Sequence, residues 1–149
     1  MIRRISAMLL AATSLFGAGV AMAAPAQADV CTPDNVCLWS GGNWTGDKRD
    51  DYSSRTNWAN ITYGGTSLPL YRGDNVVSNV STIDNWDMDT RVSVFYNSGY
   101  AGPCFKVEKY GRVSDMSYIT LSSGKNANDV MNSHRFGDWC SGTTYDFAY

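Results

Sequence analysis

An internal repeat constrains the fold of this 149-residue chain more than any other feature. Residues 39–46 have the pattern aromatic-x4-aromatic-x-Gly, and residues 95–102 repeat it 56 positions later. Each copy is followed, 35 and 33 residues after its first aromatic, by an Asx-rich segment, at 74–79 and at 128–133. Two motifs that recur in the same order at near-equal spacing indicate two copies of one structural unit.

The residues around these motifs favour strands. Short β-prone runs at 36–39, 91–96 and 104–107 are separated by clusters of Gly, Asn, Asp and Ser, and no stretch repeats apolar residues at helical spacing. Such spacing predicts an all-β sandwich or barrel. Within each aromatic motif we expect a folded hairpin whose Gly takes a positive φ, with Trp39 and Phe95 also part of the core.

The first 28 residues have the features of a signal peptide, because two arginines precede an apolar run that ends in small residues. We expect cleavage between Ala28 and Asp29, leaving one domain over 29–149. A membrane anchor is disfavoured because the run is shorter than the roughly 20 residues that span a bilayer. A secreted product is therefore predicted. It has 10 basic and 14 acidic residues once the two leader arginines are removed, which gives no basic surface for nucleic acid.

The cysteines fit an exported protein. All four follow the leader, and an even number in an oxidising compartment indicates two disulfides, with three pairings possible. Sequence proximity favours Cys31–Cys37, which leaves Cys104–Cys140. Zinc is the weaker alternative, because neither the C-x5-C spacing nor the isolated Cys104 has the short paired spacing of a structural zinc site.

The Asx-rich segments offer the oxygen ligands that calcium prefers, namely carboxylate, amide, hydroxyl and backbone carbonyl. The candidate side chains are Asp74, Asn75, Ser78, Asn128, Asp129 and Asn132. The alternative is that these Asx residues only cap turns through their own backbone. Calcium is the cofactor that the pattern predicts.

Motifs of common hydrolases are missing from the sequence, which has neither Gly-x-Ser-x-Gly nor His-Glu-x-x-His. The only His, His134, has Ser and Asp residues available as partners for a triad in principle. It directly follows an Asx-rich segment, however, where a turn or rim position is expected. We therefore do not expect an enzyme.

The two motifs resemble those of the βγ-crystallin superfamily. The resemblance implies a double Greek-key sandwich, with Greek-key motifs at about 29–88 and 89–149, and calcium sites that share ligands between the two loops. Carried over by position, it implies side-chain ligands from Asp74, Ser78, Asn128 and Asn132, and backbone carbonyl ligands from Val76 and Val130. The family pattern ends in Ser/Thr-Ser, whereas this chain has Ser78-Asn79 and Asn132-Ser133.

A narrower resemblance is to secreted actinobacterial proteins of the crystallin-like peptidase-inhibitor family. It is carried by the leader, an early Cys-x5-Cys followed by Leu-Trp, and the later Asn-Asp-Val-Met-Asn-Ser-His. It implies a monomer that inhibits an extracellular peptidase, expected to be a metallopeptidase. Residues 102–105 would suit a rigid reactive loop, with Cys104 held by its disulfide and Phe105 as apolar anchor. The alternative for Phe105 is an inward strand residue. The alternative for the function is a calcium-binding structural, stress or antimicrobial protein.

Overall fold

The chain is built of β-strands, as predicted, in a computed structural model that describes residues 30–148. The predicted signal peptide and its cleavage site lie outside these residues. The strands are β1 (Val36–Gly41), β2 (Thr45–Asp51), β3 (Thr82–Asn85), β4 (Val92–Asn97), β5 (Ala101–Val113), β6 (Ser133–Phe136) and β7 (Thr144–Ala148). Two single-turn 3-10 helices are η1 (Trp58–Asn60) and η2 (Met116–Tyr118).

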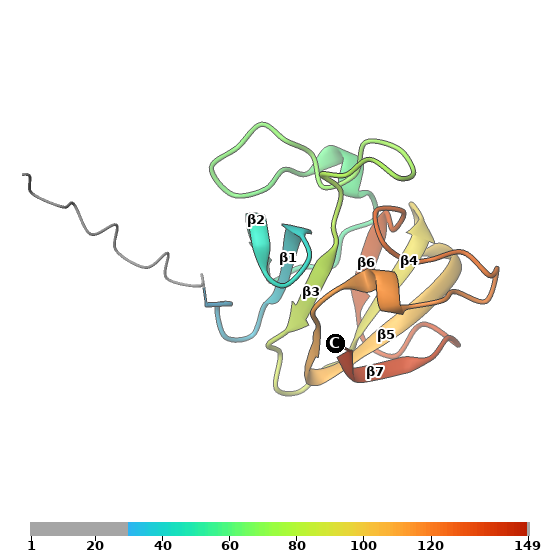
Figure 1. Cartoon of the computed structure of the whole chain (residues 1–149). Coiled ribbons are helices and arrows are strands. Elements are labelled where there is room, and N and C mark those ends of the chain that lie inside the picture. The colour runs from blue at the N-terminus through green and yellow to red at the C-terminus, as the bar shows by residue number, and fades with distance from the viewer. Residues whose placement is uncertain (1–29, 149) are drawn as a thin grey trace, which may run out of the picture.

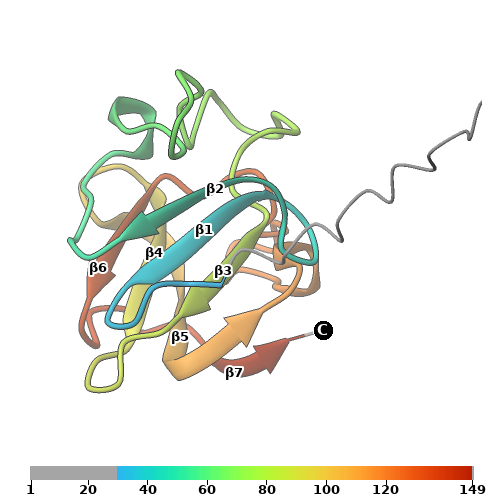
Figure 2. The same cartoon turned by 90° about the vertical axis from the view of Figure 1, so that its left-hand side faces the viewer.

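The strands form two groups that face each other across the core (Figures 1 and 2). They follow the hydrogen-bonded order β2-β1-β3-β5-β4-β6, and β7 lies parallel to β5. β5 belongs to both groups, because its first half pairs with β4 and its last residues pair with β3. In return, Arg55 of the first repeat bridges His134 in β6. Each group thus takes a strand segment from the other repeat, which is the predicted double Greek-key arrangement.

The two aromatic motifs form equivalent hairpins. Pairing in β1 shifts register between Trp39 and Gly41, and pairing in β4 shifts at the corresponding positions. The second aromatic of each motif has a left-handed backbone, with φ of 58° at Trp44 and 61° at Tyr100. The motif glycine follows with φ of 79° in both copies, and a Cβ on Gly102 would lie 2.7 Å from the Asn97 amide nitrogen. Both the conformation and the close approach therefore require glycine.

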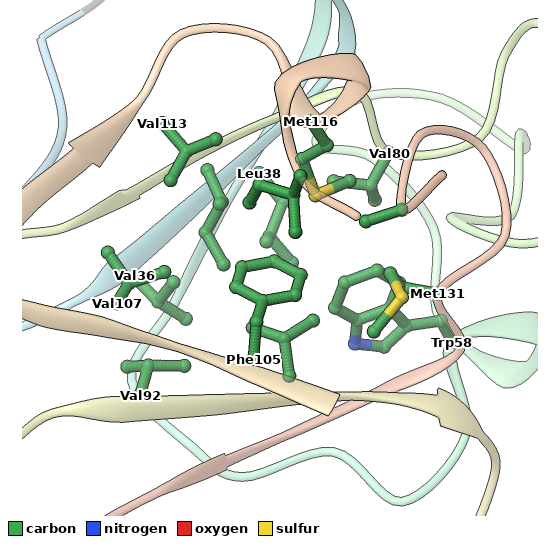
Figure 3. Close-up of a cluster of buried hydrophobic side chains, with 14 of the residues drawn as sticks. Val36, Leu38, Trp58, Val80, Val92, Phe105, Val107, Val113, Met116 and Met131 are labelled. Carbon is green, nitrogen blue, oxygen red and sulfur yellow. The ribbon is translucent and has the colours of Figure 1, made fainter. Parts of the chain in front are cut away.

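The core lies between the two groups of strands and takes side chains from both repeats (Figure 3). Val36 and Leu38 of β1 face Val92 and Phe105 of the second repeat, and Trp58 of η1 closes one end. All are at most 1% exposed. Burial of these large apolar side chains is the main stabilising term of the fold.

Two disulfides have the predicted pairing. Cys31–Cys37 joins the first described segment to β1, and Cys104–Cys140 ties β5 to the segment that leads into β7. The Cα atoms are 5.7 and 6.0 Å apart, within the usual range. Asp50 lies beside Cys31 and Cys37 in a cluster of potential metal ligands, but both sulfur atoms are used in the disulfide.

Candidate functional site

The two Asx-rich segments lie side by side in the fold. The backbone N–H of Asn75 donates to the carbonyl of Asp129 over 3.0 Å, and the buried Asn79 amide donates to the same carbonyl over 2.8 Å. Asn75 and Asp129 both have left-handed backbones, with φ of 62° and 59°. The fold therefore brings the two predicted calcium segments together.

Strand register shows that the segments do not correspond as the sequence pattern suggests. Thr82 pairs with Trp39 of β1 in the way that Ser133 pairs with Phe95 of β4. The hydroxyls of Thr82 and Ser133 also make equivalent bonds, each of 2.7 Å, to the carbonyls of Gly41 and Asn97. Residues 77–82, rather than 74–79, therefore occupy the place of residues 128–133.

This displacement of three residues changes which residues of the first loop correspond to those of the second. The sequence match relied on the adjacent Asx pair, whereas the structure matches the residues that enter β3 and β6. By this register Ser78 stands where Asp129 stands in the second loop, and Ser81 stands where Asn132 stands. The signal for the right alignment was present in the sequence, in the β-prone residues that follow each segment.

Asp74 is engaged by protein donors. One of its carboxylate oxygens accepts from the Tyr71 hydroxyl over 2.7 Å, and the other accepts from Tyr96 and lies 3.5 Å from the Lys125 ammonium. Although burial opposes ionisation, hydrogen bonds from Tyr96 and Tyr71 and the charge of Lys125 lower the pKa of Asp74. Asp74 therefore acts as the acceptor of an exposed network.

Two further predicted oxygens of the first loop, those of Ser78 and Val76, are also occupied. The Ser78 hydroxyl accepts from the Arg72 guanidinium, and the Val76 carbonyl accepts from the N–H of Asn79 over 2.8 Å. Asn79 is fully buried, and its side chain also accepts from the N–H of Arg72 and donates to Gly73. The positively charged Arg72 thus already contacts Ser78, the residue that corresponds to Asp129 in the second loop.

The second loop has a different character. One Asp129 oxygen accepts from the Ser81 hydroxyl over 3.0 Å, and the other accepts from the Asn128 side-chain amide over 2.9 Å. The Asn128 side-chain oxygen has no hydrogen-bond partner and is the only enclosed polar side-chain atom in this state within residues 30–148. Burial raises the pKa of Asp129, the Ser81 hydrogen bond opposes this, and the nearby Asp115 carboxylate adds a smaller upward shift.

These oxygens fit a hard cation. Ser81 lies within hydrogen-bond reach of the Ser40 carbonyl as well, at 3.3 Å, so carboxylate, hydroxyl, amide and carbonyl oxygens gather at one place. A divalent cation there would offset the charge repulsion on Asp129 and satisfy the Asn128 oxygen. Both repeats contribute oxygens to this place, and Ser81, Asp115 and Ser40 were not among the predicted residues.

Two predicted members of the second loop have other surroundings. The Asn132 side-chain oxygen accepts from the backbone N–H of Trp58 over 3.0 Å, which fixes the start of η1. The side chain of Val130 is 3% exposed and packs in the core, and its backbone carbonyl stays a predicted ligand. The candidate site is therefore centred on Asn128 and Asp129.

The segment expected to form a reactive loop is part of a strand. Cys104 and Phe105 lie within β5 and pair with Phe95 and Val94 of β4. Phe105 is 1% exposed and makes an edge-on contact with Tyr145, with ring centres 6.0 Å apart. The expectation of an exposed apolar anchor at Phe105 is thus replaced by its alternative, an inward strand residue.

His134 also differs from the expected rim position, because it is fully buried in β6. The Trp58 indole N–H donates to its Nδ1 over 2.9 Å, and its Nε2 lies 2.9 Å from the Ser53 carbonyl oxygen. Both ring nitrogens have structural partners, and no serine hydroxyl contacts them among the described residues.

None of the helices in the described part of the chain is long and apolar enough to cross a membrane.

Comparisons with known proteins agree with the topology. No family model and no curated protein matches the chain. A structure from work on the evolution of the eye-lens βγ-crystallin domain fold matches with a TM-score of 0.52 and 17% identity, covering 72% of this chain and 88% of its own. A βγ-crystallin from Ciona intestinalis and one from an archaeon match at TM-scores of 0.44, with 17% and 16% identity over 68% and 70% of this chain and 98% and 99% of theirs. The first match and the exchanged strand segments show that this chain has the fold of βγ-crystallin domains.

Proposed function

We propose that the protein is a secreted calcium-binding protein in which one ion, held at the second Asx loop, stabilises the fold. The observation that carries the proposal is the enclosed and unpartnered side-chain oxygen of Asn128 beside the Asp129 carboxylate. Carboxylate and amide oxygens are preferred calcium ligands, and Ser81 adds a hydroxyl from the other repeat.

One site is proposed rather than the two that the resemblance implies. In the first loop, Arg72 contacts Ser78 and Lys125 lies 3.5 Å from Asp74. These positive charges oppose a second cation and satisfy the oxygens that would bind it. With few charged ligands, the remaining site belongs with the weak sites of extracellular modules, whose Kd values are about 10⁻⁴ to 10⁻³ M.

Secretion is supported by two features, the leader in the sequence and the two disulfides of the fold. Disulfides persist in oxidising compartments outside the cytosol. Calcium at millimolar concentration outside cells would then be sufficient to load a weak site.

The test is thermal unfolding of the oxidised protein with and without calcium. At a calcium concentration of 100 times Kd, binding adds about 2.7 kcal/mol to the free energy of unfolding. For a domain of this size that raises the melting temperature by roughly 10 °C. Magnesium serves as the control for general ionic effects.

Two matched variants locate the site. Asp129→Asn retains an oxygen that can accept from Ser81 but removes the charge, and it is expected to abolish most of the calcium-induced rise. Asp74→Asn is the control, because Asp74 already has protein donors and lies in the other loop. The proposal fails if Asp129→Asn keeps the full rise, or if calcium changes the melting temperature no more than magnesium.

Inhibition of an extracellular peptidase by a monomeric protein stays a prediction that rests on the narrower resemblance. Because Phe105 is buried, inhibition would have to use another surface. Titration of a thermolysin-type metallopeptidase and a subtilisin-type serine peptidase with the oxidised protein at fixed calcium tests it. Stoichiometric loss of either activity would establish an inhibitor.

A further inference from the structure

A cleft of about 340 Å³ lies between the first hairpin and the end of β3. Its walls include Trp39, Trp44 and Trp86, three of the five tryptophans of the chain. Arg112, Asn43 and Asp84 contribute polar side chains. We propose that this cleft binds a pyranose ring of a polysaccharide, with preference for one that carries a carbonyl substituent such as an acetamido group.

The polar groups of the cleft are mostly hydrogen-bond donors without protein partners. The indole N–H groups of Trp39 and Trp86 and the side-chain amide of Asn43 have no hydrogen-bond partner among the described residues, and none of these groups is enclosed by protein. Of the side-chain acceptors in the cleft, the Asp84 carboxylate is already occupied by Trp44 over 2.7 Å and by Arg112 over 2.9 and 3.0 Å, whereas the Asn43 amide oxygen can still accept. A fitting ligand must therefore supply acceptors for the two indole N–H groups.

The walls require a ligand with flat apolar faces as well. Indole rings bury large areas in offset or edge contacts while their N–H groups bond to polar partners. One face of a pyranose ring is lined by C–H groups, and its ring oxygen, hydroxyls and acetamido carbonyl accept hydrogen bonds. The cleft volume is at the lower end of small-molecule sites, which suits one or two rings better than an extended peptide.

Charge and rigidity point the same way. The Arg112 guanidinium lies 4.4 Å from the centre of the Trp44 ring and is neutralised by Asp84, so the cleft has no net field for a polyphosphate. Trp44 is fixed by the left-handed turn of its hairpin, and Trp86 packs against the group that contains the Cys31–Cys37 disulfide. A preformed site loses little conformational entropy when a ligand binds.

Titration of tryptophan emission with tetra-N-acetylchitotetraose tests the proposal, and cellotetraose, which has the same linkage without acetamido groups, tests the preference and should bind more weakly. The acetamido sugar should shift and quench the emission with saturation. Trp86→Ala should weaken binding at least about tenfold. Trp139→Ala is the control, because Trp139 is 57% exposed, outside the cleft, and donates to the Phe136 carbonyl. The affinity of Trp139→Ala for the acetamido sugar should stay within about twofold of that of the parent protein.

A second variant guards against misfolding of Trp86→Ala. Asn43→Gly removes an exposed amide at a φ of 54°, which glycine adopts freely, and should also weaken binding while the melting temperature stays near that of the parent. The proposal is overturned if neither saccharide changes the emission up to about 10 mM. It is overturned as well if Trp139→Ala weakens binding as much as Trp86→Ala, or if a decaproline peptide binds at Trp86 and the sugars do not.

Discussion

His134 should make the stability of the protein depend on pH between neutrality and pH 4. It is the only histidine of the chain and is fully buried. Burial lowers the pKa of His134 to about 4, although the charge of Asp51 and the Ser53 carbonyl act in the opposite direction. Geometry gives the reason: Nδ1 accepts from Trp58, so a proton on Nδ1 would face the indole N–H.

The sign and size of the effect follow from proton linkage. The unfolded chain has an ordinary histidine pKa of about 6.5, so between pH 6.5 and 4 it binds more protons than the folded protein. The contribution to stability is therefore full above pH 6.5 and is lost as the pH falls towards 4. We expect a loss of about 2 kcal/mol by pH 5 and about 3 kcal/mol in total.

Urea unfolding at pH 7.5, 6.5, 5.5 and 5.0 measures this loss, and His134→Gln is the reference because Gln does not titrate. The difference in pH dependence between the two proteins isolates the histidine from the carboxylates. A direct reading comes from the NMR titration of the imidazole in the folded protein. Equal pH dependence of the two proteins, or an imidazole pKa near 6.5, would refute the reasoning.

Two further predictions concern packing and covalent structure. Phe105→Ala should lower the free energy of unfolding by about 3–5 kcal/mol in urea, because it empties a large buried site; near-parental stability would contradict the core position. Replacing Cys104 and Cys140 together by Ala should cost about 3.8 kcal/mol in the loop-entropy model for residues 36 apart. A calorimetric loss below about 1 kcal/mol would show that this bridge constrains the unfolded chain little.

The repeat made most of the fold predictable. Aromatic and glycine spacing placed both hairpins, because positive φ at Gly46 and Gly102 is a local requirement that sequence shows directly. The disulfides followed because the Cys31–Cys37 pair is close in sequence and leaves only one other pairing. Turns and short-range disulfides of this kind can be predicted without knowing which distant residues are in contact.

The candidate site was only partly predictable, because it depends on register. Asp129 was found from its residue type, but Ser81 is 48 positions away in the sequence and reaches it only through the packing of the two repeats. Asp74 appeared equally suitable until its contacts with Tyr96 and Lys125 were known. The position of His134 could not be read either, since its burial is set by Trp58, 76 positions away.

The shared strand β5 has a consequence for how the chain can be divided. Each disulfide lies within one repeat, so no covalent link other than the backbone near residues 86–91 joins the halves within the described part of the chain. Yet neither half can complete its own sheet, because Arg55 pairs with β6 and the end of β5 pairs with β3. A single proteolytic cut in that link would therefore leave two fragments that remain associated. Halves produced separately would be expected to fold only when mixed, because each supplies a strand segment that the other lacks.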